Sequence, residues 1–190
     1  MKAPRILIMA LTIALAVGYW PAQAGEAPVT ESSLIKAVNA LEAATGGKVL
    51  EIRFVDETGH ERFESVIAKP DEVIYMAANP VTEDVTKIAV KEVPAWMLNW
   101  KLTAYVKSIG KATVPLAKAI SKAEALAGAP GIGAGLAKPL SGMNQVLAYD
   151  VELLKGEKRE MIAIDATNGA KIANPEEIYE PWTPVRLVRN

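Results

Sequence analysis

The chain of 190 residues contains no cysteine, which excludes disulfide bonds and zinc–thiolate sites. Its only histidine is His60, beside Gly59 in a predicted turn, and only 6% of its residues are aromatic. Catalysis by Ser-His-Asp or Cys-His, and histidine-rich metal sites, need partners that one turn histidine does not supply. We therefore predict no bound metal, and a stability that depends on apolar cores.

Long hydrophobic runs are absent except at the N-terminus. Two cations precede an apolar run from Ile6 to Val17, and the small-residue sequence Pro21 to Ala24 follows it. This order is typical of a signal peptide with an Ala-x-Ala cleavage site. A membrane span needs about 20 apolar residues, more than this run contains. We expect residues 1–24 to be removed, which leaves a periplasmic or secreted chain with no stable membrane insertion that begins at Gly25.

Charge of one sign is not in excess either. Without residues 1–24 the chain carries 19 Lys or Arg against 22 Asp or Glu, a net charge of −3. A chain with this balance has no excess of positive charge to attract polyanions, so we expect no nucleic-acid partner. The remaining 166 residues suffice for one ordinary domain or two small ones.

An internal repeat is the most informative feature that the sequence does contain. At a constant offset of 82 residues, segment 33–47 matches segment 115–129. Both segments have apolar residues at helical spacing, and a glycine follows each, as a left-handed C-cap requires. The identical pairs are Leu34/Leu116, Lys36/Lys118, Ala37/Ala119, Glu42/Glu124, Ala43/Ala125 and Gly46/Gly128. The residues predicted to be buried are Leu34, Val38, Leu41, Leu116 and Ile120.

After each helix the hydrophobic period changes from 3.6 to 2, which predicts strands. In the first copy, segments 50–54 and 63–67 flank a turn, and a third strand is expected at 73–78. In the second copy, segments 147–153 and 162–164 flank a turn, while glycines make 132–140 the weakest of the predicted strands. The predicted fold class is α+β, with two tandem repeats, each one helix packed on a small antiparallel sheet of about three strands. Such small units are expected to share a core or to pack edge to edge.

The predicted domain organisation follows from these patterns. Residues 1–24 are the signal peptide, 25–88 the first repeat, 89–113 a connector, 114–175 the second repeat and 176–190 a tail that its prolines make irregular. Apolar residues at spacings of three and four after Pro94 predict a helical connector.

Large aromatic residues are concentrated in this connector. Trp96 and Trp100 lie four residues apart, on one side of the predicted helix, and Tyr105 follows. Packing beneath both repeats is the favoured interpretation, because helical apolar stripes are generally core. A partner surface formed by Trp96, Trp100 and Tyr105, including a homodimer contact, is the alternative.

The end of the second copy resembles the PepSY domain family. The matching residues are Tyr149-x-Val151-x-Leu153, a charged turn, and Ile162-x-Ile164-Asp165-Ala-Thr-Asn-Gly169-Ala-Lys-Ile172. Asp165 can accept backbone N–H bonds in an Asx-type turn and Gly169 can supply a positive φ, so this is a structural turn. In the first copy Asn79-Pro80 replaces Asp-Ala and no glycine stands at the position of Gly169, which leaves the shape of that turn open.

The resemblance implies an extracytoplasmic binding or inhibitory module without catalytic residues, of the kind associated with peptidase propeptides and envelope proteins. The tandem layout is also similar to that of β-lactamase inhibitors. We expect no enzyme and no cofactor, and a protease inhibitor-like protein that binds a protein or peptide such as an envelope peptidase. The alternatives are a structural or assembly protein of the cell envelope and, with least support, a hydrolase that uses scattered carboxylates.

Overall fold

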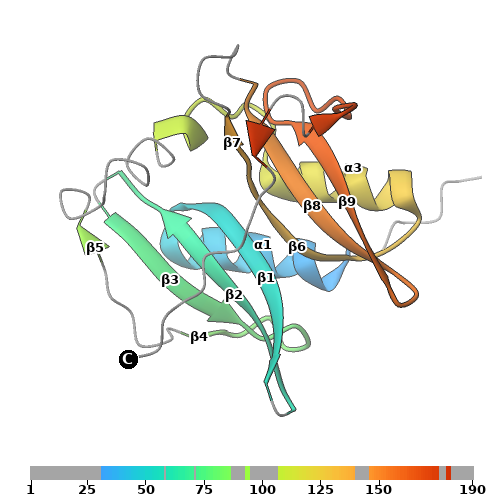
Figure 1. The fold of residues 1–190 in the computed structure, drawn as a ribbon. Helices are drawn as coiled ribbons and strands as arrows, with labels where there is room; N and C mark the ends of the chain where they lie inside the picture. The colour runs from blue at the N-terminus through green and yellow to red at the C-terminus, as the bar shows by residue number, and fades with distance from the viewer. Residues whose placement is uncertain are drawn as a thin grey trace, which may run out of the picture. The chain divides into compact units, whose positions relative to one another are not determined.

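Two amphipathic helices cover one face of a continuous antiparallel sheet (Figure 1). This computed structural model describes residues 31–57, 59–70, 72–86, 93–94, 107–139, 146–175 and 179–180. The elements in chain order are α1 (Ser33–Thr45), β1 (Lys48–Glu57), β2 (His60–Ala68), β3 (Glu72–Ala78), β4 (Val85–Thr86), β5 (Val93–Pro94), α3 (Leu116–Ala127), β6 (Gly131–Leu136), β7 (Lys138–Pro139), β8 (Ala148–Lys155), β9 (Lys158–Asp165) and β10 (Tyr179–Glu180). The fold class is α+β, as the sequence predicts.

Both helices occupy their predicted segments. α1 begins where Ser32 Oγ accepts a hydrogen bond from the Ile35 N–H at 3.3 Å, an N-cap, and α3 begins after Pro115. Gly46 and Gly128 end the helices in the left-handed region, with φ of 67° and 64°, as predicted. The residues predicted to be buried are all at most 3% exposed: Leu34, Val38, Leu41, Leu116 and Ile120.

The sheet has the strand order β4-β3-β2-β1-β6-β8-β9, and β5 pairs with β3 to make eight strands. Its six longer strands form two groups, β3-β2-β1 and β6-β8-β9. The groups meet where β1 and β6 pair antiparallel, with Ile52 opposite Ala134. The two predicted small sheets are therefore joined into one, because the first strand of each group forms hydrogen bonds with the first strand of the other.

The main core lies between the helices and the sheet. Strand residues such as Ile52, Ile67, Val151 and Ile164 pack there with residues of both helices in one cluster. α1 contacts β1, β2, β3 and β6, while α3 contacts β6, β8 and β9, and the two helices contact each other. Because the pleat alternates, the remaining strand residues lie on the second face, opposite α1 and α3.

Several predicted elements reach beyond the described residues. The signal peptide lies outside them, and so does most of the connector, although β5 pairs with β3 at its start. The tail was expected to be irregular, but Tyr179–Glu180 forms the short strand β10, which pairs antiparallel with β7. Pairing with a distant segment is not visible in the local pattern of prolines.

Candidate functional site

A turn built around Asp165 ends strand β9. Asp165 Oδ1 accepts hydrogen bonds from the N–H groups of Thr167 at 2.7 Å and Asn168 at 3.3 Å. The Gly169 N–H donates to the Asp165 carbonyl at 2.8 Å, and Gly169 has a φ of 75°. Burial alone would raise the pKa of Asp165, but the hydrogen bonds from Thr167 and Asn168 outweigh it and lower the pKa. Asp165 and Gly169 therefore hold a turn.

A turn with the same pattern follows β3 in the first half of the chain. Asn79 Oδ1 accepts hydrogen bonds from the N–H groups of Val81 at 2.8 Å and Thr82 at 3.0 Å. The Glu83 N–H donates to the Asn79 carbonyl at 3.1 Å. Glu83 stands where Gly169 stands in the other turn, and its φ is 60°. A glutamate here takes the left-handed conformation, and its ion pair with Lys36 at 2.9 Å ties the turn to α1.

A glutamate near the end of each helix reaches the strand that follows. Glu42 Oε1 accepts a hydrogen bond from the Val49 N–H at 3.1 Å. Glu124 Oε1 accepts one from the Gly131 N–H at 2.7 Å. These two glutamates are one of the identical pairs of the internal repeat, and the sequence pattern alone assigns them no role. The contact forms only after the left-handed glycine has reversed the chain, so helical periodicity cannot reveal it.

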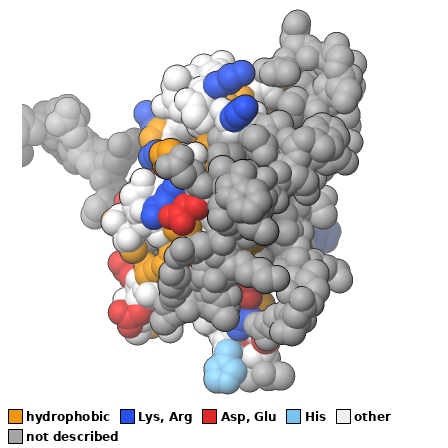
Figure 2. Space-filling model, turned by 90° about the vertical axis from the view of Figure 1, so that its left-hand side faces the viewer, with side chains coloured by type: hydrophobic (Ala, Val, Ile, Leu, Met, Phe, Trp, Pro, Cys, Tyr) orange, Lys and Arg blue, Asp and Glu red, His pale blue; other side chains and the backbone are white. Residues whose placement is uncertain are grey.

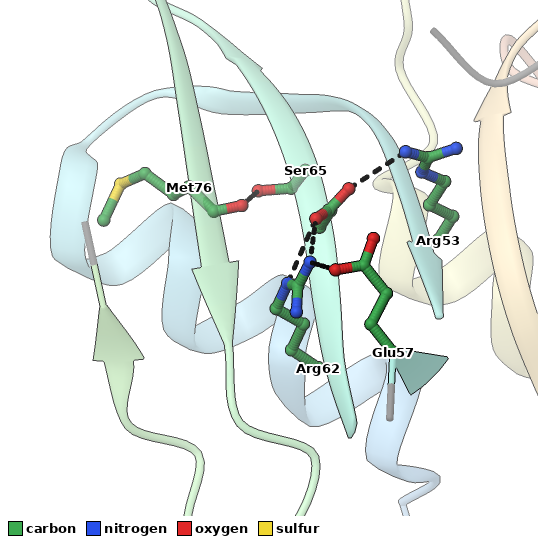
Figure 3. Close-up of polar contacts among 6 residues, drawn as sticks. Arg53, Glu57, Arg62, Ser65 and Met76 are labelled. Atoms are coloured by element: carbon green, nitrogen blue, oxygen red, sulfur yellow. Dashed lines mark hydrogen bonds and ion pairs between the residues drawn. The ribbon is translucent and has the colours of Figure 1, made fainter. Parts of the chain in front are cut away.

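The second face of the sheet carries a charged network (Figure 3). Glu64 accepts hydrogen bonds from Arg53 Nη2 at 2.9 Å and from Arg62 Nη2 at 2.7 Å. Arg62 also donates to Glu57 at 3.1 Å. Burial alone would raise the pKa of Glu64, but the two guanidinium groups outweigh it and lower the pKa. The residue is a fixed carboxylate with no proton to donate near neutral pH.

This network joins the two strands of the β1–β2 hairpin. Arg53 and Glu64 are directly opposite in the register of these strands. Ser65, the next residue after Glu64, has its hydroxyl bonded to the Met76 carbonyl at 3.0 Å instead. The arrangement connects neighbouring strands, which favours a structural role for these charges.

Two further carboxylates of the second face are buried. Glu51 is 5% exposed and Asp150 is 1% exposed. In the register Glu51 and Asp150 are each opposite Gly135, which places the two carboxylates on either side of one glycine. Alternation correctly predicts that they lie opposite the apolar residues of their strands. It cannot predict their burial, because that depends on what covers the face.

The remaining site candidates have different positions. Trp96, Trp100 and Tyr105 lie outside the described residues. His60 is exposed at the β1–β2 hairpin, and its pale-blue side chain projects at the bottom of Figure 2. In the described part of the chain, no three His, Asp or Glu side chains are grouped so that they could hold a metal ion. Of the helices that are described, none is long and apolar enough to span a membrane.

Comparison with known proteins gives one structural likeness. No family model matches the chain, and no curated protein matches it. The crystal structure of a "putative lipoprotein" from Clostridium difficile 630 is similar over 75% of this chain and 91% of that chain, with a TM-score of 0.46 and 14% sequence identity. A likeness at this level assigns neither family nor function to this chain.

Proposed function

We propose that the mature chain is an exported, non-catalytic binding or inhibitory protein made of two PepSY-like copies, with a protein or peptide as its target. The observation that supports this most strongly is the pair of matching turns. Asn79 and Asp165 each accept two N–H bonds from the residues that follow, and each turn has its left-handed residue four positions on. Each turn then returns the chain to the edge of the strand that it left.

The strand order is consistent with two copies. From the junction of β1 and β6 outward, each side has the first, second and third of the longer strands that follow a helix, in the same order. Because β1 and β6 are antiparallel, a two-fold axis between them would exchange the two groups. α1 and α3, which contact each other, would be exchanged by the same axis.

The residues that recur in both halves support binding rather than catalysis. Gly46 and Gly128 cap helices, while Glu42 and Glu124 hold the following strands. None of these roles needs a reactive group. A module whose recurring residues maintain its fold can act through its exposed surface, and function has to be sought there.

The proposed location and target rest on the sequence. The segment 1–24 has the order of a secretory signal peptide, which would place the mature chain in the periplasm or outside the cell. The PepSY resemblance favours an envelope peptidase as the target. A structural or assembly role in the envelope is the alternative, in which the chain would bind cell-wall or outer-membrane components.

The test is affinity capture by the mature chain, residues 25–190, from an envelope extract of its own source. We expect the wild-type chain to retain a peptidase and to inhibit its activity when the two are mixed in purified form. The matched variant is Trp96→Ala with Trp100→Ala, which should weaken retention with little change in stability if the indoles form a partner surface. Retention of cell-wall or outer-membrane components alone would favour the structural alternative. Turnover of a substrate by the purified chain would refute the non-catalytic proposal.

A further inference from the structure

We propose that the outer edge of β9, from Lys158 to Met161, is a strand-addition site for an extended, acidic segment of the partner. This inference rests on the proposed binding function and states where the partner docks and what chemistry it presents. Strand addition uses main-chain hydrogen bonds for affinity and alternate side chains for specificity.

The backbone geometry of β9 shows which of its N–H and C=O groups a partner strand could bind. The Ile172 N–H donates to the Ala163 carbonyl at 2.9 Å, and the Asp165 N–H donates to the Ala170 carbonyl at 2.8 Å. These bonds lie on the side away from β8, so alternation also directs the backbone groups of Arg159 and Met161 away from β8. Within the described parts of the chain, no segment pairs with this side of β9 between Lys158 and Ile162.

The equivalent edge in the first half is filled by the chain itself. Asn79 and Asp165 are 86 positions apart, so Glu72 and Val73 on β3 correspond to Lys158 and Arg159 on β9. On β3 these positions pair antiparallel with β5, with Glu72 opposite Pro94 and Val73 opposite Val93. The first half thus shows an extended antiparallel segment on the edge of β3 that corresponds to this part of β9.

A short resident segment, which forms an isolated bridge with β9, sets the direction of the incoming segment. Lys171 forms a bridge with Ile164, antiparallel to β9, and the hydrogen bond to Ala163 follows. The chain then turns at Asn174, whose φ is 49°. A partner segment that continues this register would lie antiparallel to β9, beyond the point where the resident segment ends.

The side chains along the edge select an acidic segment. Lys158 and Arg159 are exposed cations at the positions that Glu72 and Val73 occupy on the filled edge. The side chain of Arg159 stays 70% exposed although it pairs with Glu152 at 2.9 Å. Met161 is an exposed apolar residue two positions after Arg159, and the exposed Glu160 lies between them. Opposite charges in directly facing positions stabilise a strand pair, so carboxylates are expected opposite the two cations and an apolar residue opposite Met161.

A second copy of the chain fits this edge less well. Two β9 strands paired about a two-fold axis would place Arg159 opposite Arg159, between two Lys158–Glu160 pairs, or else Glu160 opposite Glu160. Either register leaves like charges facing each other, which destabilises a strand pair, whereas a partner segment with two carboxylates leaves none. An axis through Met161 would require the outward groups of Ala163, whose carbonyl is already bonded to Ile172. The edge therefore favours a different chain over its own copy.

The experiment uses the mature chain and the synthetic peptide acetyl-Thr-Val-Thr-Glu-Asp-Thr-amide. In the expected register its valine faces Met161, its glutamate faces Arg159 and its aspartate faces Lys158. The N–H groups of the valine and the glutamate would then bond to β9, whereas the N–H of the threonine between them points away. A peptide that is N-methylated at both the valine and the glutamate should bind about tenfold or more weakly than the unmodified peptide. A peptide that is N-methylated at that threonine alone should bind within about twofold of the unmodified peptide.

Two measurements on the protein locate the binding. Hydrogen exchange should slow at the amides of Arg159 and Met161 when the peptide is added. Met161→Pro removes an outward N–H and should abolish binding of the peptide. The double variant Lys158→Glu with Arg159→Glu should instead prefer a peptide that has lysines in place of the two acidic residues. If the proline variant does not fold, the methylated peptides still decide the question.

Several results would overturn the proposal: equal binding of the two methylated peptides, no binding of the unmodified peptide, or protection at other strands. Protection of Arg159 and Met161 that rises with protein concentration alone would assign the edge to a second copy. The proposed function is tested separately. If Met161→Pro retains the envelope target as well as the wild type does, the proposed docking edge is wrong and the proposed binding function is unaffected. If the peptide binds at β9 but the chain retains no envelope target, the docking edge is supported and the proposed function is wrong.

Discussion

Glu83 and Gly169 occupy the same place in two turns and share the left-handed region, with φ of 60° and 75°. Each follows by four residues the side chain that holds its turn, Asn79 or Asp165. The backbone shape of the turn is therefore reached with a glycine in one half and with a glutamate in the other. This makes the conformational cost of a side chain at this position measurable.

Gly169→Ala should lower the free energy of unfolding by about 1–2 kcal/mol, because a Cβ is disfavoured in the left-handed region. Space is not the reason, since the new Cβ would lie 3.7 Å from Val114 Cγ2, an ordinary contact. Urea denaturation measures the change. The matched control is Gly110→Ala, at a glycine without a positive φ, which should unfold like the wild type. Equal losses in the two variants would show that φ is not the cause.

Asp165→Asn should keep the turn, because Asn79 holds the equivalent turn with the same two N–H bonds. Asp165→Ala removes the acceptor of the Thr167 and Asn168 N–H groups and should cost about 0.5–2 kcal/mol. Thermal unfolding of the three proteins at neutral pH compares them. An asparagine variant as unstable as the alanine variant would contradict the equivalence of the two turns.

These turns show what local sequence can and cannot predict. The helices, the hairpins and the Asp165 turn follow from short-range patterns, namely apolar spacing, alternation and the turn residues. The Asn79 turn has the same hydrogen bonds, but a glutamate in the left-handed region carries no sequence signal. Its shape could be recognised only beside that of Asp165 in the structure.

The arrangement of the sheet depends on contacts that no local pattern contains. Pairing of β1 with β6 joins strands about 80 residues apart, and it determines that β9 rather than β6 lies at an edge. The candidate docking edge therefore could not be selected from the sequence, although both β9 and its hairpin were predicted. The burial of Glu51 and Asp150 likewise depends on tertiary packing.

Acid should destabilise the protein partly through Glu64. Its pKa is lowered in the folded state by Arg62 and Arg53, so its stabilising contribution is complete above the unfolded pKa of about 4.3 and is lost as pH falls through the folded value. Glu64→Gln should be less stable at pH 7 and should lose less on acidification from pH 5 to pH 3. Urea denaturation at several pH values measures both effects. Glu157→Gln, in the exposed β8–β9 turn, is the control, and parallel pH profiles for Glu64→Gln and the wild type would contradict the prediction.

Ile120→Asp should unfold both halves together, because residues of α1, α3 and all six longer strands form one core. Ile120 is fully buried, and an unpaired charge there costs several kcal/mol against a total stability of about 5–15 kcal/mol. Amide NMR spectra report each half separately. Ser121→Asp, on the exposed side of the same helix, should leave the spectrum folded. Persistence of the folded β1–β3 signals in Ile120→Asp would show that the halves fold independently.

A close contact between the halves gives a last prediction, at Gly131 on β6 and Leu34 on α1. A Cβ at Gly131 would lie 2.7 Å from Leu34 Cδ2, so Gly131→Ala should cost about 1–3 kcal/mol by overpacking. Leu34→Ala should cost about 2–5 kcal/mol through the cavity that it leaves. In the double variant the new methyl group enters the space that Leu34 vacates.

The double variant should therefore lose less stability than the two single variants together, by about 1 kcal/mol or more. Urea denaturation of the wild type, the two single variants and the double variant completes this double-mutant cycle. The control cycle pairs Gly131→Ala with Leu116→Ala, since Leu116 is buried but is not among the atoms nearest to Gly131, and these two changes should be additive. If the Leu34 cycle is additive as well, α1 does not pack against β6 at this glycine. A coupling confined to Leu34 would show that the first helix packs directly on the first strand of the second half.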